Sequence, residues 1–264
     1  MISRLVGEET LVYSVDPPAL WAKLPGSAHQ VMKHDDEHAL LVFKDRVVVF
    51  KQDKKQVAVV LLNGPIRWCS LSGDLLWAAA GTVGFYNTTT KDSSSFDIKG
   101  HTFAAHGERL AAAAGGQLQL WEKGSLLASW QAHHSEVERM TMTADLLASC
   151  SREGALIKLW CAKTGRHLRT FRRGWTKTQV LFLGFCGDFL AAASARTLHI
   201  FDAKPDMWDL VAHPRAISQI SFDKAIDKVV VSGQELHVLC GETLSRVALD
   251  MLGQASIQSA VSVV

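Results

Sequence analysis

Two adjacent arginines, Arg172 and Arg173, are the residues of this sequence best suited to bind phosphate. They lie in a basic segment, 163–177, that contains no acidic residue. A planar guanidinium binds phosphate oxygens through two parallel charge-assisted hydrogen bonds, which a lysine ammonium cannot copy. Because successive side chains of a strand point to opposite faces, we expect the pair to serve two separate pockets.

The segment holds two further arginines, Arg166 and Arg169. A charged outer strand more often prevents edge-to-edge aggregation of sheets than it binds a ligand. We therefore interpret Arg166 and Arg169 as a solvated strand edge.

Other kinds of chemistry lack the residues to perform them. The net charge of +2 argues against a dedicated nucleic-acid binder, which needs a broad basic surface. The sequence contains no G-x-S-x-G, H-E-x-x-H, G-x-G-x-x-G or P-loop motif, so we expect no enzyme activity. The five cysteines are too widely spaced for a zinc site or redox pair, which predicts free thiols in the cytoplasm, no metal and no cofactor: Cys69, Cys150, Cys161, Cys186 and Cys240.

The elements that must position the arginines follow a repeat. Seven short β-branched or apolar runs each end in a large side chain: 11–13, 47–50, 83–86, 118–121, 157–160, 198–201 and 236–239. Their last residues lie 35 to 41 positions apart, close to the period of a four-stranded propeller blade. The pattern predicts an all-β, seven-bladed, WD40-like β-propeller.

The repeat divides the chain, 1–264, into one domain of seven blades. The ranges are 27–62, 63–98, 99–130, 131–173, 174–212 and 213–250, with one blade shared between the two ends of the chain, 1–26 and 251–264. Residues 1–26 supply too few strands for a whole blade, whereas 255–263 is one spare strand with period-two alternation. We therefore predict that the propeller closes by pairing its N- and C-terminal strands.

The basic edge resembles a known family. Phe171-Arg172-Arg173-Gly174 is similar to the F/L-R-R-G signature of the PROPPIN, or WIPI-type, seven-bladed propellers, and it falls between blades five and six as theirs does. The resemblance extends over residues 131–202 in order and spacing, including the segments 132–135, 146–154, 163–165 and 197–202.

The resemblance implies a peripheral membrane protein that binds phosphatidylinositol 3-phosphate, 3,5-bisphosphate or both. It implies an effector or scaffold in autophagy or endolysosomal traffic, at phagophore, endosomal or vacuolar membranes. It further implies autophagy proteins as partners, including a lipid-transfer protein. We expect a monomer.

The resemblance also implies two headgroup pockets. The first would be formed by Arg172 with His133, Ser149 and Ser151. The second would be formed by Arg173 with Ser194, Thr197 and His199. Hydroxyls and imidazoles would donate neutral hydrogen bonds to phosphate while the arginines supply charge, and acid would strengthen the histidine contribution.

Some positions depart from the family pattern. Ala155 stands where a threonine is common, and Lys158 where an arginine is common. The membrane-inserting loop of blade six is reduced here to the connection from Ala203 to Asp206. Met207 and Trp208 would either form a small apolar tip or begin the next strand, and we favour the second interpretation.

These departures support an alternative, a WD40-type scaffold that binds only proteins. His133 and His199 also have a structural alternative, because WD-type propellers and strand cores contain satisfied histidines. We interpret the other strand and turn histidines as structural: His101, His106, His213 and His237.

Overall fold

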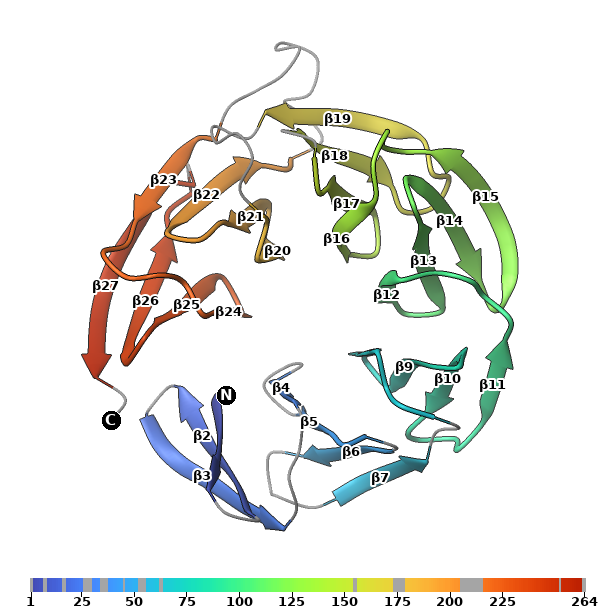
Figure 1. Ribbon diagram of the computed structural model, residues 1–264, viewed down its shortest axis with the longest axis horizontal. Coiled ribbons are helices and arrows are strands. Elements are labelled where there is room, and N and C mark those ends of the chain that lie inside the picture. The colour runs from blue at the N-terminus through green and yellow to red at the C-terminus, as the bar shows by residue number, and fades with distance from the viewer. Residues whose placement is uncertain are drawn as a thin grey trace. The chain divides into compact units, whose positions relative to one another are not determined.

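Every regular element described in the computed structural model is a β-strand (Figure 1). The structure describes the backbone of residues 2–6, 9–15, 18–25, 30–33, 38–44, 46–51, 56–61, 64–153, 156–172, 179–204, 216–251 and 253–262. Side chains are described within these ranges from residue 40 onward, except at 41, 50, 51, 56–58, 61 and 172. In this part of the chain, no helix with the length and apolarity to cross a bilayer is found.

Residues 1–98 form one compact unit that contains three antiparallel sheets. The first is β1 (Ile2–Val6), β2 (Glu9–Val15) and β3 (Pro18–Pro25). The second is β4 (Gln30–Lys33), β5 (His38–Val42), β6 (Arg46–Lys51) and β7 (Gln56–Leu61). The third is β8 (Trp68–Ser72), β9 (Leu75–Ala80), β10 (Thr82–Asn87) and β11 (Ser93–Phe96).

Residues 99–264 form a second compact unit with four antiparallel four-stranded sheets. Two of them are β12 (Thr102–His106), β13 (Arg109–Ala114), β14 (Gln117–Glu122) and β15 (Ser125–Gln131), then β16 (Val137–Met142), β17 (Leu146–Ser151), β18 (Leu156–Cys161) and β19 (His167–Arg172). The others are β20 (Phe182–Cys186), β21 (Phe189–Ala193), β22 (Thr197–Asp202) and β23 (Ser218–Ser221), then β24 (Lys228–Ser232), β25 (Glu235–Cys240), β26 (Thr243–Leu249) and β27 (Ala255–Ser262).

Successive sheets of this second unit pack face to face, with the first strand of each on the inside and the fourth on the outside (Figure 1). The sheets β16–β19 and β20–β23 share a buried cluster that includes Ile157, Phe171 and Phe201. Alanine runs lie in the middle of these stacks, and Ala191, for example, is fully buried. Small side chains let neighbouring sheets approach closely, which explains why these strands read as continuous apolar runs.

The predicted closure by terminal strands is wrong for the C-terminal strand. β27 pairs antiparallel with β26, so it is the fourth strand of the sheet that begins with β24. The short turn after Leu249, where the Gly253 amide donates to the Asp250 carbonyl at 2.9 Å, makes this local pairing less costly in loop-closure entropy than pairing with a distant strand. The N-terminal sheet has three described strands, β1 to β3.

The expected short connection after β22 is also wrong. β22 ends at Asp202 and the strand that pairs with it, β23, begins at Ser218, so residues 203–217 connect them. Met207 and Trp208, for which an apolar tip or the start of the next strand was predicted, lie outside the described residues. The sheet that contains β22 therefore extends to residue 221, and the blade boundaries stay a prediction.

Candidate functional site

Matching ends of two neighbouring sheets hold four of the residues predicted to bind phosphate: Ser151, Arg172, Ser194 and Thr197. In the first sheet Ser151 pairs with Val137, and the backbone of Arg172 pairs with Leu156. In the second sheet Thr197 pairs with Ser221, and the amide of Ser194 donates to the carbonyl of Thr197 at 2.9 Å. The link from β19 to β20 joins these two ends. The side chain of Arg172 and all of Arg173 lie outside the described residues.

His133 and Ser149 of the first pocket meet in a buried hydrogen-bond network. His133 Nε2 lies 2.8 Å from Ser149 Oγ, and the indole Nε1 of Trp160 donates to the same oxygen at 2.9 Å. Ser149 is fully buried, and His133 is 5% exposed. The hydroxyl thus serves two buried nitrogens, and its direct effect is to orient His133 and Trp160.

Aromatic packing surrounds this network. The Trp160 ring lies 5.4 Å from that of Trp130 and 5.0 Å from that of His167. The turn between β18 and β19 comes so close to Trp130 that a Cβ on Gly165, at φ +72°, would collide with the ring. A glycine is needed there both for this approach and for the left-handed backbone.

Lys158 is a further cation beside the first pocket. It pairs with Ser149 across β17 and β18, and its Nζ donates to the carbonyl of Ala132 at 2.6 Å. The ammonium thereby lies next to the backbone of His133. The sequence indicated Lys158 only as a departure from the family pattern, whereas its register places it with the predicted pocket residues.

The second pocket has a different chemistry. Ser194 is 5% exposed and its hydroxyl lies 3.5 Å from the Thr197 carbonyl, a long contact. His199 is 3% exposed and its ring stacks against Phe201 at 6.5 Å. Burial lowers the pKa of His199 from its ordinary value of 6.5 to about 4. His199 is therefore neutral between pH 5 and 7, so acid in this range does not charge it.

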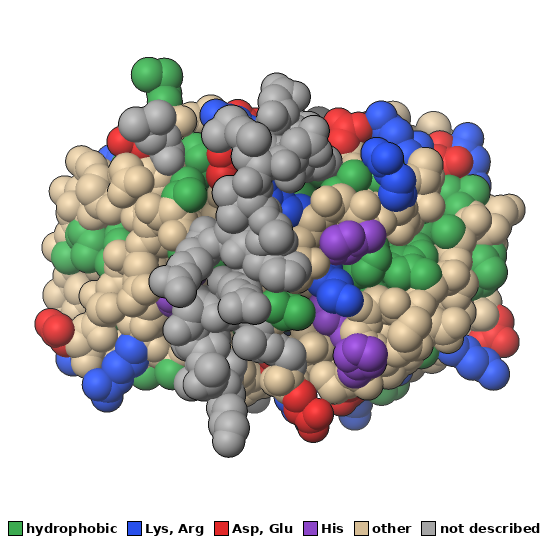
Figure 2. All heavy atoms as spheres, turned by 90° about the horizontal axis from the view of Figure 1, so that it is seen from above, with side chains coloured by type: hydrophobic (Ala, Val, Ile, Leu, Met, Phe, Trp, Pro, Cys, Tyr) green, Lys and Arg blue, Asp and Glu red, His purple; other side chains and the backbone are tan. Residues whose placement is uncertain are grey.

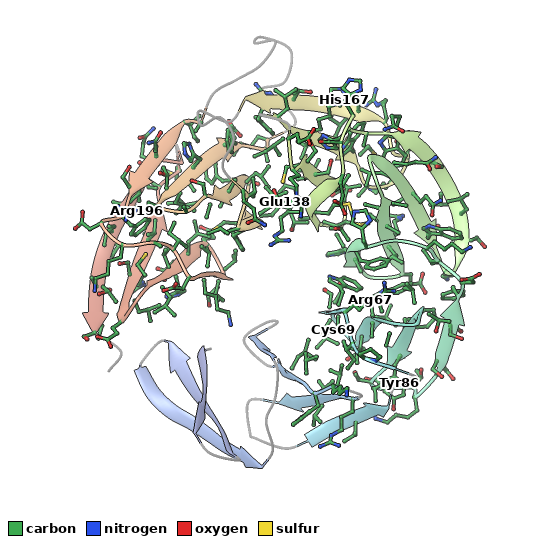
Figure 3. The ribbon with its side chains drawn as sticks, viewed as in Figure 1. Arg67, Cys69, Tyr86, Glu138, His167 and Arg196 are labelled. Carbon is green, nitrogen blue, oxygen red and sulfur yellow. The ribbon has the colours of Figure 1, made fainter. Side chains whose placement is uncertain are left out.

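Two arginines that the sequence analysis did not select lie in turns at the same ends of the sheets. Arg152 follows Ser151 after β17 and is exposed, with its guanidinium 3.9 Å from Glu136. Arg196 lies in the exposed turn between β21 and β22, directly before Thr197. Figure 3 shows Arg196 in the sheet next to the one that carries His167. Both arginines are sequence neighbours of hydroxyls already assigned to the pockets, Ser151 and Thr197, and this adjacency is the signal by which the sequence could have indicated them.

The surface near β19 combines histidines with basic side chains. Figure 2, which looks onto the molecule from the β19 side of Figure 1, shows histidine, Lys and Arg side chains gathered together. Arg166 is exposed there, as expected of a solvated edge. The same interpretation is wrong for Arg169, which is 8% exposed and lies with its guanidinium 5.5 Å from the Phe171 ring. The face of the strand explains this, because Arg169 points with Phe171 toward the next sheet.

No group of three or more His, Cys, Asp or Glu side chains that could hold a metal ion occurs among the residues with described side chains. The five cysteines are free thiols, and burial raises the pKa of Cys69 to about 12 and that of Cys186 to about 11.

Comparisons with known proteins support the resemblance seen in the sequence. No family model matches the chain. SVP1-like protein 2 of Schizosaccharomyces pombe is 35% identical over 102 residues, and Autophagy-related protein 18e of Arabidopsis thaliana is 34% identical over 98 residues. These matches cover 37% and 35% of this chain but only 26% of each relative, so the chain matches about a quarter of their length.

The whole chain is similar in fold to solved propellers. Kluyveromyces lactis Hsv2 is 18% identical with a TM-score of 0.77, covering 97% of this chain and 93% of that one. KlAtg21, solved in complex with the coiled-coil of AgAtg16, is 13% identical with a TM-score of 0.73, covering 97% and 93%. The resemblance to PROPPINs and the all-β propeller fold class are confirmed, and the relatives are autophagy-related proteins. The number of blades stays a prediction.

Proposed function

We propose that this chain binds phosphatidylinositol 3-phosphate, phosphatidylinositol 3,5-bisphosphate or both in membranes. It acts as a non-catalytic effector or scaffold in autophagy or endolysosomal membrane traffic. The observation that carries the proposal is the placement of Arg172, Ser151 and Thr197 at matching ends of two adjacent sheets. The autophagy-related names of the relatives support it.

The first pocket is assigned to Arg172 with His133, Ser149 and Ser151, and Lys158 is added to it. Arg172 supplies the bidentate contact and Lys158 a second positive charge. Since Ser149 is fully buried and bonded to His133, its part is to hold the imidazole in place.

The second pocket is assigned to Arg173 with Ser194, Thr197 and His199, and Arg196 is added at its edge. Thr197 is half-buried and Arg196 exposed, so both are open to a ligand at the surface. The neutral His199 ring contributes a hydrogen bond and no charge.

Membrane contact is proposed to be peripheral, at phagophore, endosomal or vacuolar membranes. The 203–217 connection is long enough to contribute, and it contains Met207 and Trp208. Two headgroup sites acting together raise the affinity above that of either one, and each basic side chain near the surface adds about 1 kcal/mol.

Protein partners are proposed to be autophagy proteins, including a lipid-transfer protein. KlAtg21, which shares this fold, was solved with a coiled-coil of AgAtg16. We propose that the chain binds them as a monomer and binds no nucleic acid.

The test is flotation of the protein with phosphatidylcholine vesicles that contain phosphatidylinositol, its 3-phosphate or its 3,5-bisphosphate. The Arg172→Ala/Arg173→Ala variant should lose at least about 100-fold in affinity for the phosphorylated lipids, since each of its two charged contacts contributes about 1.5–3 kcal/mol. Lys163→Ala/Arg166→Ala is the matched control, because it removes the same charge from exposed residues of the turn at the other end of β18 and β19. Equal losses in both variants would reduce the site to general basic attraction.

A protein-binding scaffold is the second candidate. The His133–Ser149–Trp160 network favours it, because these side chains are used within the fold. The short connection that had supported it is replaced by residues 203–217. Wild-type protein that floats with none of the lipids, yet recovers partners from membrane-free cytosol, would establish this alternative.

A further inference from the structure

Glu138 is an acidic side chain buried at an irregularity in the innermost strand of its sheet. The pairing of β16 with β17 shifts between Val137 and Arg139, so Glu138 is the extra residue of a β-bulge. It is 7% exposed. A bulge turns its side chain away from the regular alternation of the strand, and here it turns a carboxylate toward the next sheet.

This carboxylate binds the neighbouring sheet directly. Glu138 Oε2 accepts a hydrogen bond from the backbone amide of Val180 at 3.2 Å, across 42 residues of sequence. Val180 is fully buried, and the next amide, Leu181, donates to Ala193 of β21 at 2.9 Å. Figure 3 shows Glu138 on the inner edge of the second unit, where β16 and β20 face each other. The contact thus joins the start of one sheet to the start of the next.

The same bulge is also joined to the sheet on its other side. The carbonyl of Val137 accepts hydrogen bonds from Thr102 Oγ1 at 3.1 Å and from His101 Nε2 at 3.2 Å. Val137 and Glu138 therefore link three successive sheets at one point. The bond from Val180 is buried and the two bonds to Val137 are partly buried, and together they restrict how far the three sheets can move against one another at this point.

We propose that Glu138 is a positioning residue that sets the spacing between the two headgroup pockets, one in each of the sheets it joins. This inference rests on the proposed function. A protein with two sites on one membrane gains affinity only when both sites reach the surface together. A shift of one sheet would leave each pocket intact but would lower the gain from joint binding.

If Glu138 served only to stabilise the fold, its replacement would lower the free energy of unfolding, which we do not expect. The apolar cluster of Ile157, Phe171, Phe201 and their neighbours already holds the two sheets together. Glu138 Oε1 has no hydrogen-bond partner among the described residues, so burial of the charge offsets much of the gain from the single bond. We therefore expect little change in overall stability and a local change in geometry when Glu138 is replaced.

The experiment compares Glu138→Ala with Glu138→Gln. Both remove the negative charge, but only glutamine keeps an oxygen that can accept from the Val180 amide. Three quantities are measured on the full chain: hydrogen exchange at the Val180 amide, binding of soluble inositol 1,3-bisphosphate, and binding to vesicles with phosphatidylinositol 3-phosphate.

For Glu138→Ala we expect about tenfold faster exchange at Val180 and about tenfold weaker vesicle binding, with soluble headgroup binding changed less than about twofold. Glu138→Gln should restore both the exchange rate at Val180 and the vesicle binding to the wild-type values. Unchanged exchange in Glu138→Ala overturns the contact itself. Faster exchange with unchanged vesicle binding, or an equal loss for vesicles and soluble headgroup, overturns the positioning role. If wild-type protein binds neither lipid nor headgroup, the proposed function fails and the positioning role with it, while the exchange result still decides the contact.

Discussion

The two predicted pockets each contain a buried histidine and a serine, yet the structure uses these residues differently. In the first, His133 and Ser149 are bonded to each other and to Trp160 through the serine hydroxyl. In the second, Ser194 makes a long contact to a nearby carbonyl, and His199 is held neutral by burial. Similar residue types thus build a rigid framework in one sheet and a less tightly bonded group in the next.

The comparison separates two ways in which a fold can prepare a phosphate site. A fully bonded network fixes the direction of its imidazole but leaves its hydroxyl little capacity to bind a ligand. A turn with exposed or half-buried donors, such as Arg196 and Thr197, offers contacts directly but holds them less firmly.

Ser149→Ala should lower the free energy of unfolding by about 3 kcal/mol, because it leaves two buried nitrogens, on His133 and Trp160, without this oxygen. Ser194→Ala, the matched change in the second sheet, should cost less than about 1 kcal/mol because the contact it removes is long. Urea denaturation of both variants measures this. Equal losses would show that the two sheets use their serines alike.

His199→Gln should make stability less sensitive to acid. The folded-state pKa of His199 is lowered to about 4, so its contribution is fully present above pH 6.5 and is lost as the pH falls toward 4. Between pH 7 and pH 4.5 the free energy of unfolding should therefore fall by about 2 kcal/mol more in the wild-type protein than in the variant. Denaturation curves at the two pH values test this, and parallel losses in both proteins would contradict the burial of His199.

Lys158→Ala should weaken binding to vesicles with phosphatidylinositol 3-phosphate about fivefold, because it removes a cation beside the first pocket. Lys158→Arg should restore binding, since it keeps the charge. Lys163→Ala, an exposed lysine in the turn at the other end of the sheet, is the control for charge alone. A loss as large in Lys163→Ala would mean that Lys158 has no specific place in the pocket.

Arg196→Ala should weaken the same binding by about threefold, less than Lys158→Ala, because an exposed charge is screened by salt. The loss should shrink further when the ionic strength is raised, which flotation at two salt concentrations would measure. If Arg196→Ala binds as wild type at low salt, the turn between β21 and β22 is not part of the second pocket.

Much of the fold could be predicted because it is written in local patterns. The run 157–160 reads as a strand and forms most of β18, and the alanines at 191–193 read as a buried strand and lie within β21. The outer strands were harder. β23 has only four residues, and β27 is mostly exposed, so neither has a strong apolar pattern to show which sheet it joins.

The candidate site divides in the same way. The basic segment could be selected from residue types, because phosphate binding requires cations, whereas the hydroxyls of the two pockets were indicated only by the resemblance to PROPPINs. The burial of Arg169, the place of Lys158 and the bonded state of Ser149 could not, because each depends on which face of a strand a side chain occupies and on what the next sheet brings against it.

The strand repeat, the all-β class and the arginine pair of the basic segment could all be found from the residues in order along the chain. Three contacts became visible in the folded chain alone: His133 and Trp160 both bond to Ser149, Glu138 accepts from the Val180 amide, and β27 pairs with β26. The physical reason is that strand periodicity is encoded by neighbours in the chain. Hydrogen bonds between sheets depend instead on register and packing between residues far apart in it.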